Sequence, residues 1–367
     1  MSPQRATVRS RRSSPRVAVV GAAGPAGSAV ASALVAAGFP VVAVDDRRGG
    51  APGTWRVGDV AAPGGAALLA GAQVVVHVAA ADDLEAALAL TGPQRRAHAV
   101  RAARAVGTAA RDAGAARLVV VTSAMVHGAA ADNPVPLPDD APVPADGGAG
   151  IVGDLVEVEA TLAALAHAAG LPLTVLRPAA LVGPGVDSMV TRHFEAPRLL
   201  EVRGARAARQ FCHVDDLGTA VVTALTAGLD GPLGVGCEGW LDAGQTARLT
   251  RLRTVELPPA IAFGTAERLH RVGVLPMPAA ELAFVVHPWV VSSQRLRAAG
   301  WAPTRTNADC LTELLALVAG RRAVAGRRVE GREAAAGAAG AAVALLGAAA
   351  LVRRARARRP GPRRPTL

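Results

Sequence analysis

Short apolar runs alternate with alanine-rich stretches along the first half of the chain. The runs that predict strands span residues 16–20, 41–44, 73–78, 117–122 and 173–176. Because each run is short and nearly continuous, it is typical of a strand that is buried on both faces. The stretches between them, such as residues 28–37, predict helices. This alternation predicts an α/β fold in which helices cover both faces of a doubly wound parallel sheet.

The pattern changes again in the second half of the chain. Beyond residue 185 the apolar runs become shorter and mixed to about residue 320, which predicts a smaller C-terminal lobe laid over the edge of the sheet. We therefore divide the chain into a basic, disordered leader (1–15), a sheet domain (16–185), a smaller lobe (186–320) and an arginine-rich tail (321–367).

Charge is concentrated at the two ends of this chain of 367 residues. Residues 1–16 hold five arginines and no acid, and residues 321–367 hold twelve arginines against two glutamates, so that the total of +11 leaves about −4 for residues 17–320. This mildly acidic body, with 2% aromatic residues, disfavours a nucleic-acid-binding core, which needs a basic groove and stacking side chains. The basic ends can contact phosphate or an anionic lipid surface, or remain without a partner.

The tail contains an uncharged stretch at residues 334–352, in which eleven of nineteen residues are alanine and three are glycine. As a helix it would be roughly 28 Å long, barely the thickness of the hydrocarbon core of a membrane. Alanine and glycine drive insertion weakly, and arginines flank both ends. Two interpretations stay open: the stretch contacts a membrane, or it is a surface-lying or disordered tail.

Cysteine usage favours a cytoplasmic protein. Cys212, Cys237 and Cys310 are odd in number and far apart, which argues against a disulfide framework and against a metal-binding motif of short spacing. The first sixteen residues lack the apolar run that a secretory signal needs. We therefore predict a cytoplasmic location and no bound metal, and membrane association through residues 334–352 stays open.

Three glycines, Gly21, Gly24 and Gly27, lie at intervals of three between the first strand and the following helix. Glycines at such a turn let a pyrophosphate approach backbone N–H groups at the N-terminus of the helix, where the helix dipole favours an anion. The motif therefore predicts a dinucleotide-binding site.

Residues at the ends of later strands extend this prediction. Asp45 ends the second strand, where a carboxylate can bind the adenosine ribose hydroxyls and would repel a 2′-phosphate. This favours NAD over NADP, although the arginine pair at 47–48 can approach such a phosphate. Asp59 follows a third short strand, where it can contact the adenine amino group or simply cap a turn. Ala79 ends the fourth strand, where a small residue lets a flat ring pass close to the backbone.

Five further segments resemble, in order, motifs of one protein family. They are residues 74–80 (VVVHVAA), 121–128 (VTSAMVHG), 176–185 (LRPAALVGPG), 211–216 (FCHVDD) and 299–303 (AGWAP). Together with the glycine turn, they resemble the extended branch of the short-chain dehydrogenase/reductase superfamily, and within it the NAD-dependent epimerase/dehydratase family.

This resemblance covers residues 16–320 and carries expectations about fold and ligands. It implies a Rossmann-type, NAD-binding domain at 16–185 and a substrate lobe at 186–320. Members of this branch act on nucleotide sugars, which implies a ligand of that class. Relatives commonly form dimers through paired helices, which implies a homodimer.

The helix after the fifth strand departs from the family pattern. Relatives carry Tyr-x-x-x-Lys there, with an acidic residue eight positions after the Tyr; alignment on Glu159 places Ile151 at the Tyr position and Leu155 at the Lys position. In the family the Tyr is the general acid/base, and the Lys lowers its pKa and binds the nicotinamide ribose. The sequence contains no tyrosine and no lysine at all, so no other alignment restores the pair. The family's standard mechanism is therefore not open to this chain.

Three residues are candidates to take over part of that chemistry. Ser123 matches the Ser or Thr with which the family hydrogen-bonds a substrate carbonyl or hydroxyl. His127 can exchange protons near neutral pH, although a histidine at a strand end is more often structural. Asp154 lies three residues after Ile151, so that it can point toward the cofactor pocket or serve only as an acid at the helix N-terminus.

Arginines of the second lobe are candidates for binding an anionic substrate. Arg209 lies two residues before Phe211, where similar sugar-nucleotide enzymes place an arginine on the substrate diphosphate. Arg192, His193, Arg203 and Arg206 are near in sequence and can enlarge the site, since guanidinium groups bind phosphate oxygens in pairs. The alternative is a solvated basic stretch.

Two functional hypotheses follow from these observations. The first is an NAD-binding, atypical member of the epimerase/dehydratase family that acts on or binds a nucleotide-sugar-like small molecule. The second is a non-catalytic NAD-binding sensor or scaffold, whose arginine-rich ends recruit a membrane or a partner. Only the first predicts turnover.

Overall fold

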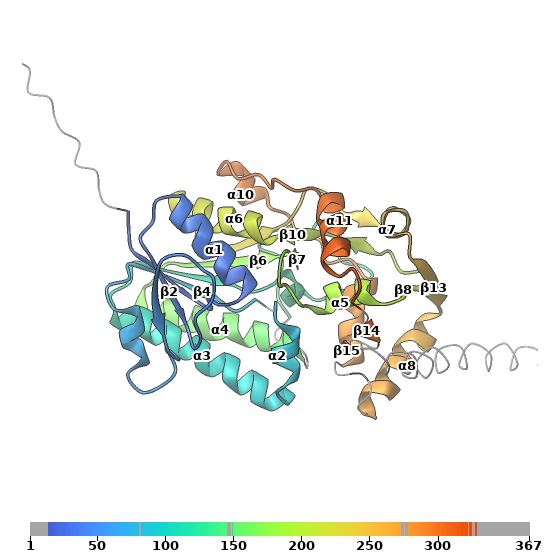
Figure 1. Cartoon of the computed structure of the whole chain (residues 1–367), viewed down its shortest axis with the longest axis horizontal. Helices are drawn as coiled ribbons and strands as arrows, with labels where there is room; N and C mark the ends of the chain where they lie inside the picture. Colours follow the sequence, from blue (N-terminus) through green and yellow to red (C-terminus); the bar gives the residue numbers. More distant parts are fainter. Residues whose placement is uncertain are drawn as a thin grey trace, which may run out of the picture.

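The computed structural model describes residues 14–80, 82–144, 148, 150–272, 275, 278–321, 323–324 and 327–328. Figure 1 shows a central sheet between two layers of helices, with a further group of helices and short strands beyond one end of the sheet. None of the helices formed by these residues is both long enough and apolar enough to cross a membrane. The stretch at 334–352 lies outside the described residues.

A parallel sheet of seven strands forms the centre of the described chain. Its strands lie in the order β11 (Gly231–Val235), β6 (Leu173–Pro178), β5 (Arg117–Val121), β4 (Val74–Val78), β1 (Val17–Val20), β2 (Val41–Asp45) and β3 (Thr54–Val57). Every neighbouring pair is parallel. From β1 the chain builds the sheet first toward β3 and then, across β4, toward β11. The Rossmann-type, doubly wound sheet that the sequence predicts is confirmed.

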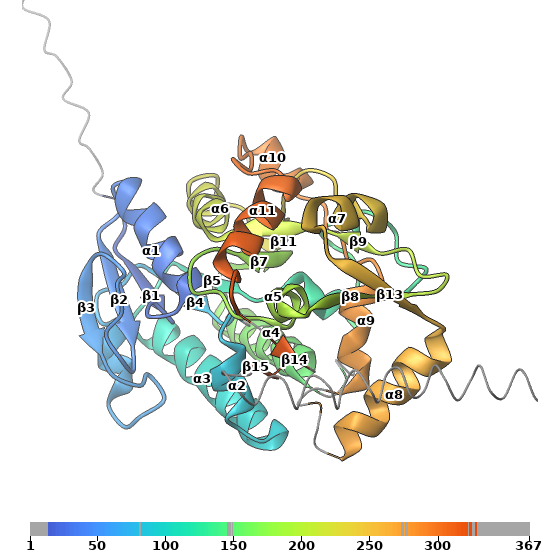
Figure 2. The same cartoon turned by 45° about the vertical axis from the view of Figure 1, so that its right-hand side comes forward.

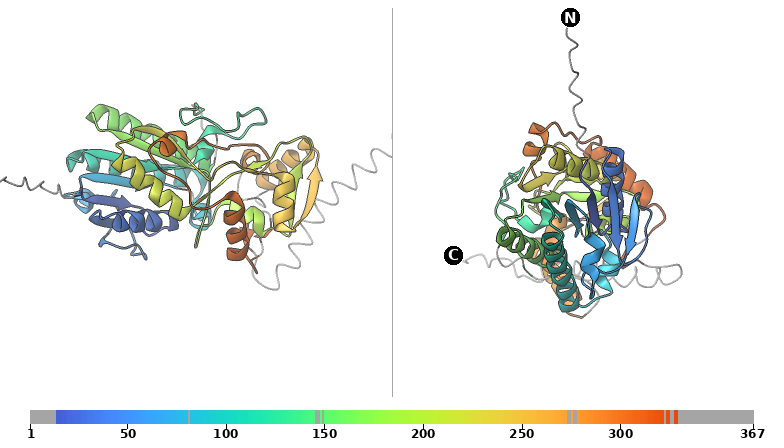
Figure 3. Two further views of the ribbon diagram at one scale, coloured as in Figure 1. Left: turned by 90° about the horizontal axis from the view of Figure 1, so that it is seen from above. Right: turned by 90° about the vertical axis from the view of Figure 1, so that its left-hand side faces the viewer.

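Strand β1 shows why the apolar runs are continuous. Val17 and Val19 belong to one buried cluster and Ala18 to another, because successive side chains of a strand point to opposite faces of the sheet. The helices that cover the two faces are α1 (Pro25–Ala36) and α6 (Val214–Thr226) on one, and α3 (Gly92–Asp112) and α4 (Ile151–Ala169) on the other. Figure 3 shows these layers on either side of the sheet. A strand buried on both faces needs an apolar residue at nearly every position.

The second group of elements packs beside the sheet, as Figure 2 shows. It comprises β7 (Ala180–Val182), α5 (Met189–Glu195), β8 (Arg198–Val202), β9 (Ala208–Arg209), β10 (Phe211–His213), β12 (Leu241–Asp242), α7 (Ala243–Thr250), β13 (Arg253–Leu257), α8 (Pro259–Arg271), η3 (Ala279–Leu282), α9 (Ala283–Val286) and α11 (Asn307–Leu317). Its strands form three small pairs, β7 with β10, β9 with β12 and β8 with β13. The structure also adds β11 and α6 to the layers of the main sheet, beyond the boundary expected at residue 185.

Shorter elements complete the described chain. They are η1 (Gly65–Leu69), α2 (Leu84–Leu88), η2 (Ala124–His127), α10 (Gln294–Ala298), β14 (Ala323–Val324) and β15 (Arg327–Arg328). Helix α1 begins earlier than predicted, because extended Gly24 is its N-cap and Pro25 occupies the first helical position, where a missing N–H costs nothing. This early start places the N-terminus of α1 directly after the glycine turn.

Candidate functional site

The glycine turn joins β1 to α1 by a close backbone approach. Gly21 has a φ of 88°, and a Cβ built on it would lie 2.6 Å from the carbonyl oxygen of Val78 on β4. A Cβ on Gly27 would overlap the carbonyl oxygen of Gly21. Both positions therefore require glycine, because any side chain would push the turn open. At Gly24 a Cβ would meet only ordinary contacts, the nearest at 3.6 Å.

Asp45 ends β2 next to this turn. Its Oδ2 accepts a hydrogen bond from the N–H of Ala23 at 2.9 Å. Burial is the largest cause that raises the pKa of Asp45. A carboxylate held here, at the end of the strand beside the glycine turn, fits the predicted contact with a ribose.

The other two predicted cofactor residues, Asp59 and Ala79, follow strands β3 and β4. Asp59 is exposed, and its Oδ1 accepts a hydrogen bond from the N–H of Ala61 at 2.8 Å, which is the contact of a turn-capping residue. The N–H of Ala79 donates to the carbonyl oxygen of Val121 at 2.9 Å, which extends the pairing of β4 with β5 by one residue. The adenine contact of Asp59 stays a prediction.

Asp82 is a part of this site that the sequence analysis missed. It follows β4, is 8% exposed, and its Oδ2 accepts a hydrogen bond from the N–H of Ala26 in the first turn of α1 at 2.9 Å. Burial is the main cause that raises the pKa of Asp82 to about 6. The available signal was an acid placed just after a buried strand, at the edge of the sheet where the glycine turn lies.

A mostly apolar pocket lies at the N-terminus of α4. Its apolar lining residues include Leu84, Met125, Ile151, Leu181, Met189, Val190 and Trp289. Hydroxyl groups line it through Thr122, Ser123 and Ser188, and no titratable side chain lines it among the residues that the structure describes. The structure thus places Ser123 and Ile151, which align with the Ser and Tyr positions of the family pattern, in the lining of one pocket. Leu155 is buried in the large core cluster instead.

His127 lies outside this lining, in a buried network behind it. Its Nδ1 is 3.2 Å from the carbonyl oxygen of Pro142, and its Nε2 is 3.5 Å from Nη1 of Arg177. Burial first, and then the charge of Arg177, lower the pKa of His127. Arg177 in turn binds Glu159 at 2.7 Å, and Glu159 accepts from Thr122 at 2.5 Å. These contacts match the structural interpretation of the histidine.

Asp154 points to the neighbouring helix rather than into the pocket. Its two oxygens accept hydrogen bonds from Nε of Arg95 at 2.5 Å and Nε of Arg96 at 3.0 Å, both on α3. Asp154 is buried and stands in the first turn of α4. Of the two interpretations of Asp154, these contacts match the acid at the helix N-terminus and not the one in which its carboxylate points toward the cofactor pocket, because two guanidinium groups of α3 bind it.

Another acid that the sequence analysis missed is Glu281 of η3. Its Oε1 accepts a hydrogen bond from the N–H of Ile151 at 2.8 Å, while its buried Oε2 has no hydrogen-bond partner among the described residues. Burial, the largest cause, raises the pKa of Glu281 to about 7. The second lobe therefore contributes a buried carboxyl group to the start of the helix that would carry the Tyr.

The three predicted substrate arginines occupy different places. Arg209 lines a second pocket, which shares Val190 and Trp289 with the first, and pairs with Glu201 at 3.3 Å. Arg192 is buried and binds Asp187 through two nitrogens, at 2.8 and 2.6 Å. It therefore serves a structural ion pair, which corrects its expected position.

Arg203 also departs from the expected cluster. It is exposed and faces Glu256 at 3.4 Å across the β8–β13 pair, away from both pockets. His193, another member of the expected cluster, lines the second pocket with Arg209, and burial, followed by the charge of Arg209, lowers the pKa of His193 to about 3. A neutral imidazole and a buried guanidinium thus share one wall of the second pocket.

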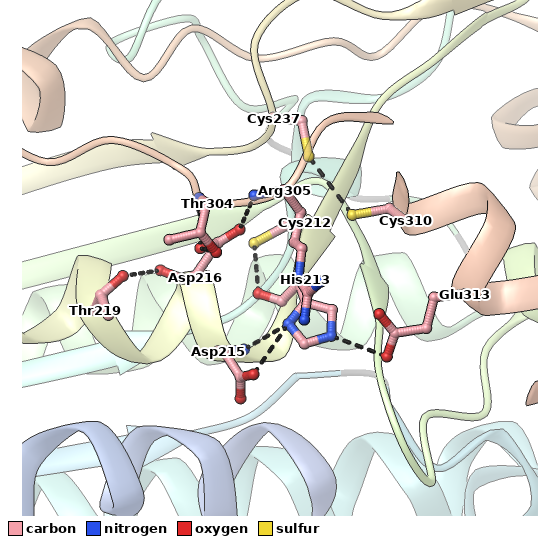
Figure 4. A network of polar contacts seen from close by, with 10 residues as sticks. All are labelled: Cys212, His213, Asp215, Asp216, Thr219, Cys237, Thr304, Arg305, Cys310 and Glu313. Carbon is pink, nitrogen blue, oxygen red and sulfur yellow. Dashed lines mark hydrogen bonds and ion pairs between the residues drawn. The ribbon is translucent and has the colours of Figure 1, made fainter. Parts of the chain in front are cut away.

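The segment at 211–216 joins the second lobe to the sheet layers, as Figure 4 shows. Asp216 accepts hydrogen bonds from Thr304 at 2.7 and 2.8 Å and from the N–H of Arg305 at 3.3 Å. His213 caps α6 through the N–H of Asp215 and contacts Glu313 at 3.2 Å. This motif therefore fixes the C-terminal segments of the lobe against α6.

Comparison with known proteins places this geometry in a family. The model of the NAD dependent epimerase/dehydratase family matches residues 17–234. Uncharacterized proteins of Mycobacterium tuberculosis and Mycobacterium bovis are each 24% identical over 201 residues, which are 54% of this chain and 53% of each relative. The chain thus spans about half the length of the curated relatives it matches.

Solved structures of nucleotide-sugar enzymes share the fold. The UDP-glucose 4-epimerase of Thermus thermophilus, solved with NAD, is 17% identical and has a TM-score of 0.61, over 83% of this chain and 99% of that one. DesIV of Streptomyces venezuelae, a dTDP-glucose 4,6-dehydratase solved with NAD and TYD, is 18% identical with a TM-score of 0.62, over 82% and 96% of the two chains. At these identities the likeness shows the fold alone.

Proposed function

The chain belongs to the NAD dependent epimerase/dehydratase family, and from this premise we propose that it is an atypical member that binds NAD and a nucleotide-sugar-like ligand. Its chemistry is altered or weak, because the Tyr that transfers protons in relatives and the Lys that lowers the pKa of that Tyr have no counterpart in this sequence. The observation that carries this proposal is the lining of the pocket at α4. Ile151 contributes a hydrocarbon side chain there, and the described part of the lining holds no side chain that could act as a general acid or base.

The cofactor half of the proposal rests on the glycine turn. The close approach of Gly27 to Gly21 leaves no room for a side chain at Gly27. The Asp45 carboxylate lies beside the turn, where it could accept hydrogen bonds from the hydroxyls of the adenosine ribose. These residues fit a dinucleotide, and the Asp45 carboxylate favours NAD over NADP because it would repel a 2′-phosphate. When bound, NAD would supply a hydride acceptor beside the pocket that Ser123 lines.

The ligand half rests on Arg209. A guanidinium group that is nearly buried in a pocket wall suits the phosphate oxygens of a nucleotide diphosphate. Several structures of the same fold are of enzymes for UDP- or dTDP-sugars, which supports this ligand class. Ser123 would donate to or accept from a hydroxyl of the sugar.

The experiment that tests the proposal measures binding and turnover on the same purified full chain. Calorimetry with NAD, with Gly24→Asp as the control that fills and charges the phosphate turn, is expected to give binding only in the wild type. Incubation with NAD and a panel of nucleotide sugars is expected to give at most slow formation of an epimer, a keto product or NADH. No binding of NAD or NADP at any pH would overturn the proposal.

A second candidate is a non-catalytic, NAD-binding sensor or scaffold, which the apolar pocket lining favours. It predicts cofactor binding and no product from any nucleotide sugar, so the same incubation separates it from the first. Homodimer formation, a cytoplasmic location and membrane contact through residues 334–352 also stay predictions.

A further inference from the structure

The N-terminus of α1 already holds a carboxylate. Oδ2 of Asp82 accepts a hydrogen bond from the N–H of Ala26 at 2.9 Å, and both Asp82 oxygens lie within 3.7 Å of the place where a Cβ of Gly24 would be. This is the position at which a dinucleotide pyrophosphate binds in a fold of this type. Asp82 is also 8% exposed, so its charge is little screened by water.

The first turn of α1 has few N–H groups to offer an anion. Pro25 at the first helical position has no N–H, and the N–H of Ala26 is bonded to Asp82. Earlier in the turn, the N–H of Ala23 is bonded to Asp45. A pyrophosphate that binds the Ala26 N–H must therefore take this donor from a carboxylate. Two negative groups then share one low-dielectric site unless one of them loses its charge.

We propose that Asp82 competes with the pyrophosphate of a nicotinamide dinucleotide for the N-terminus of α1, so that the chain admits the dinucleotide when this carboxyl group is protonated or has turned away. The inference rests on the proposed function, since it concerns the same cofactor. A protonated Asp82 brings no repulsion, and its O–H can donate to a phosphate oxygen. Asp82 is thus a residue that sets the affinity for the cofactor and makes it dependent on pH.

The charged surroundings of Asp82 favour proton uptake. Asp45, at the end of β2, and Asp83, in its own loop, both raise the pKa of Asp82. Asp83 is half exposed and lies 3.9 Å from Arg47. Asp187, whose backbone N–H donates to the carbonyl oxygen of residue 82, is bound to an arginine of α5. Among these groups no cation pairs directly with the Asp82 carboxylate.

The size of the effect follows from the fraction of protein that is competent to bind. With a pKa of about 6, half of Asp82 is protonated at pH 6 and about one part in a hundred at pH 8. If only the protonated form admits the pyrophosphate, the apparent affinity for NAD falls by up to about 50-fold between these pH values. Binding near pH 7 would then take up close to one proton.

The experiment is calorimetric titration of the full chain with NAD at pH 6 and pH 8, and at pH 7 in two buffers of different ionisation enthalpy. For the wild type we expect weaker binding at pH 8 and net proton uptake. Asp82→Asn keeps an oxygen that accepts the Ala26 N–H bond but carries no charge, so it should bind NAD at pH 8 at least 10-fold more tightly than the wild type, with little pH dependence. The neighbouring, half-exposed Asp83→Asn is the matched control: it should keep the pH dependence and the proton uptake, with the transition moved to slightly lower pH because the charge of Asp83 contributes to the raised pKa of Asp82.

Other outcomes would overturn the inference. If the wild type binds NAD with equal affinity at both pH values and takes up no proton, the role of Asp82 is refuted while NAD binding stands. The same conclusion follows if Asp82→Asn keeps the pH dependence of NAD binding, or if Asp83→Asn loses that pH dependence. No binding by the wild type or Asp82→Asn at pH 6 would refute both this inference and the proposed function. If Asp82→Asn fails to fold, the pH dependence and proton uptake of the wild type decide the matter.

Discussion

Glu281 gives a quantitative prediction about how the second lobe joins α4. The residue is 3% exposed, caps the first turn through the N–H of Ile151 and leaves Oε2 without a hydrogen-bond partner among the described residues. Glu281→Gln keeps an oxygen for the Ile151 bond and removes the charge. We therefore expect this substitution to stabilise the protein at pH 8 and to have little effect at pH 5.

The magnitude follows from the pKa of the carboxyl group. Burial, opposed in part by the Ile151 hydrogen bond and the charge of Arg95, raises the pKa of Glu281 from 4.5 to about 7. Because the folded pKa lies above the unfolded one, the associated stability is fully present below pH 4.5 and is lost as the pH rises through 7. At 1.36 kcal/mol per unit, the loss is about 3 kcal/mol. In Glu281→Gln the side-chain NH₂ takes the position of Oε2 and lacks a hydrogen-bond partner there, which offsets part of the gain. We therefore expect the free energy of unfolding to rise by about 1–2 kcal/mol at pH 8.

The assay is urea unfolding of the wild type and Glu281→Gln at pH 5 and pH 8, with the free energy of unfolding taken from each transition. Glu267→Gln, at an exposed i,i+4 pair on α8, is the control and should change stability by less than about 0.5 kcal/mol at either pH. An unfolding free energy of Glu281→Gln that equals the wild type at pH 8, or a gain that is the same at both pH values, would refute the reasoning.

Three further predictions concern the turn, the helix pair and the second pocket. Gly27→Ala should lower the free energy of unfolding, measured in urea, by at least about 2 kcal/mol, because the new Cβ would overlap the Gly21 carbonyl oxygen. Gly24→Ala should lower it by about 1 kcal/mol or less, and an equal loss in the two variants would contradict the described turn. Asp154→Asn should lose about 2–3 kcal/mol, since it leaves two arginines of α3 without their charged partner, and unchanged stability would argue against that ion pair. Arg209→Met should weaken UDP binding at least 10-fold in calorimetry with NAD affinity unchanged, and unchanged UDP binding would remove this arginine from the ligand site.

The sheet and the glycine turn are predictable from the sequence because their causes are local. A strand covered on both faces needs a continuous apolar run, and β1, β2, β4, β5 and β6 all have one. The tight turn needs glycine at fixed spacing, as the overlap at Gly27 shows. Ser123 and Ile151 could be placed in one pocket because each occupies a recognisable position after β5 or at the start of α4.

The remaining site residues depend on partners far away in the sequence. Asp82 meets Ala26 of α1 across 56 residues, and Glu281 meets Ile151 across 130 residues. Asp154 has the helical spacing that was expected, but α3 supplies the arginines that turn it away from the pocket. Arg192 is the exception, because its partner Asp187 is only five residues away and the short separation alone could have predicted this ion pair.

The central claim is that the chain keeps a dinucleotide turn but has lost the proton-transfer pair of its family. The most direct measurement is NMR of one sample that contains the purified full chain, NAD and UDP-glucose at pH 6.5, followed over time. The account predicts that the NAD resonances report binding while UDP-glucose is converted at a rate at least 10²-fold below the usual 1 s⁻¹ or more of an enzyme. Conversion of UDP-glucose at about 1 s⁻¹ or faster, or NAD resonances unchanged by the protein, would contradict it.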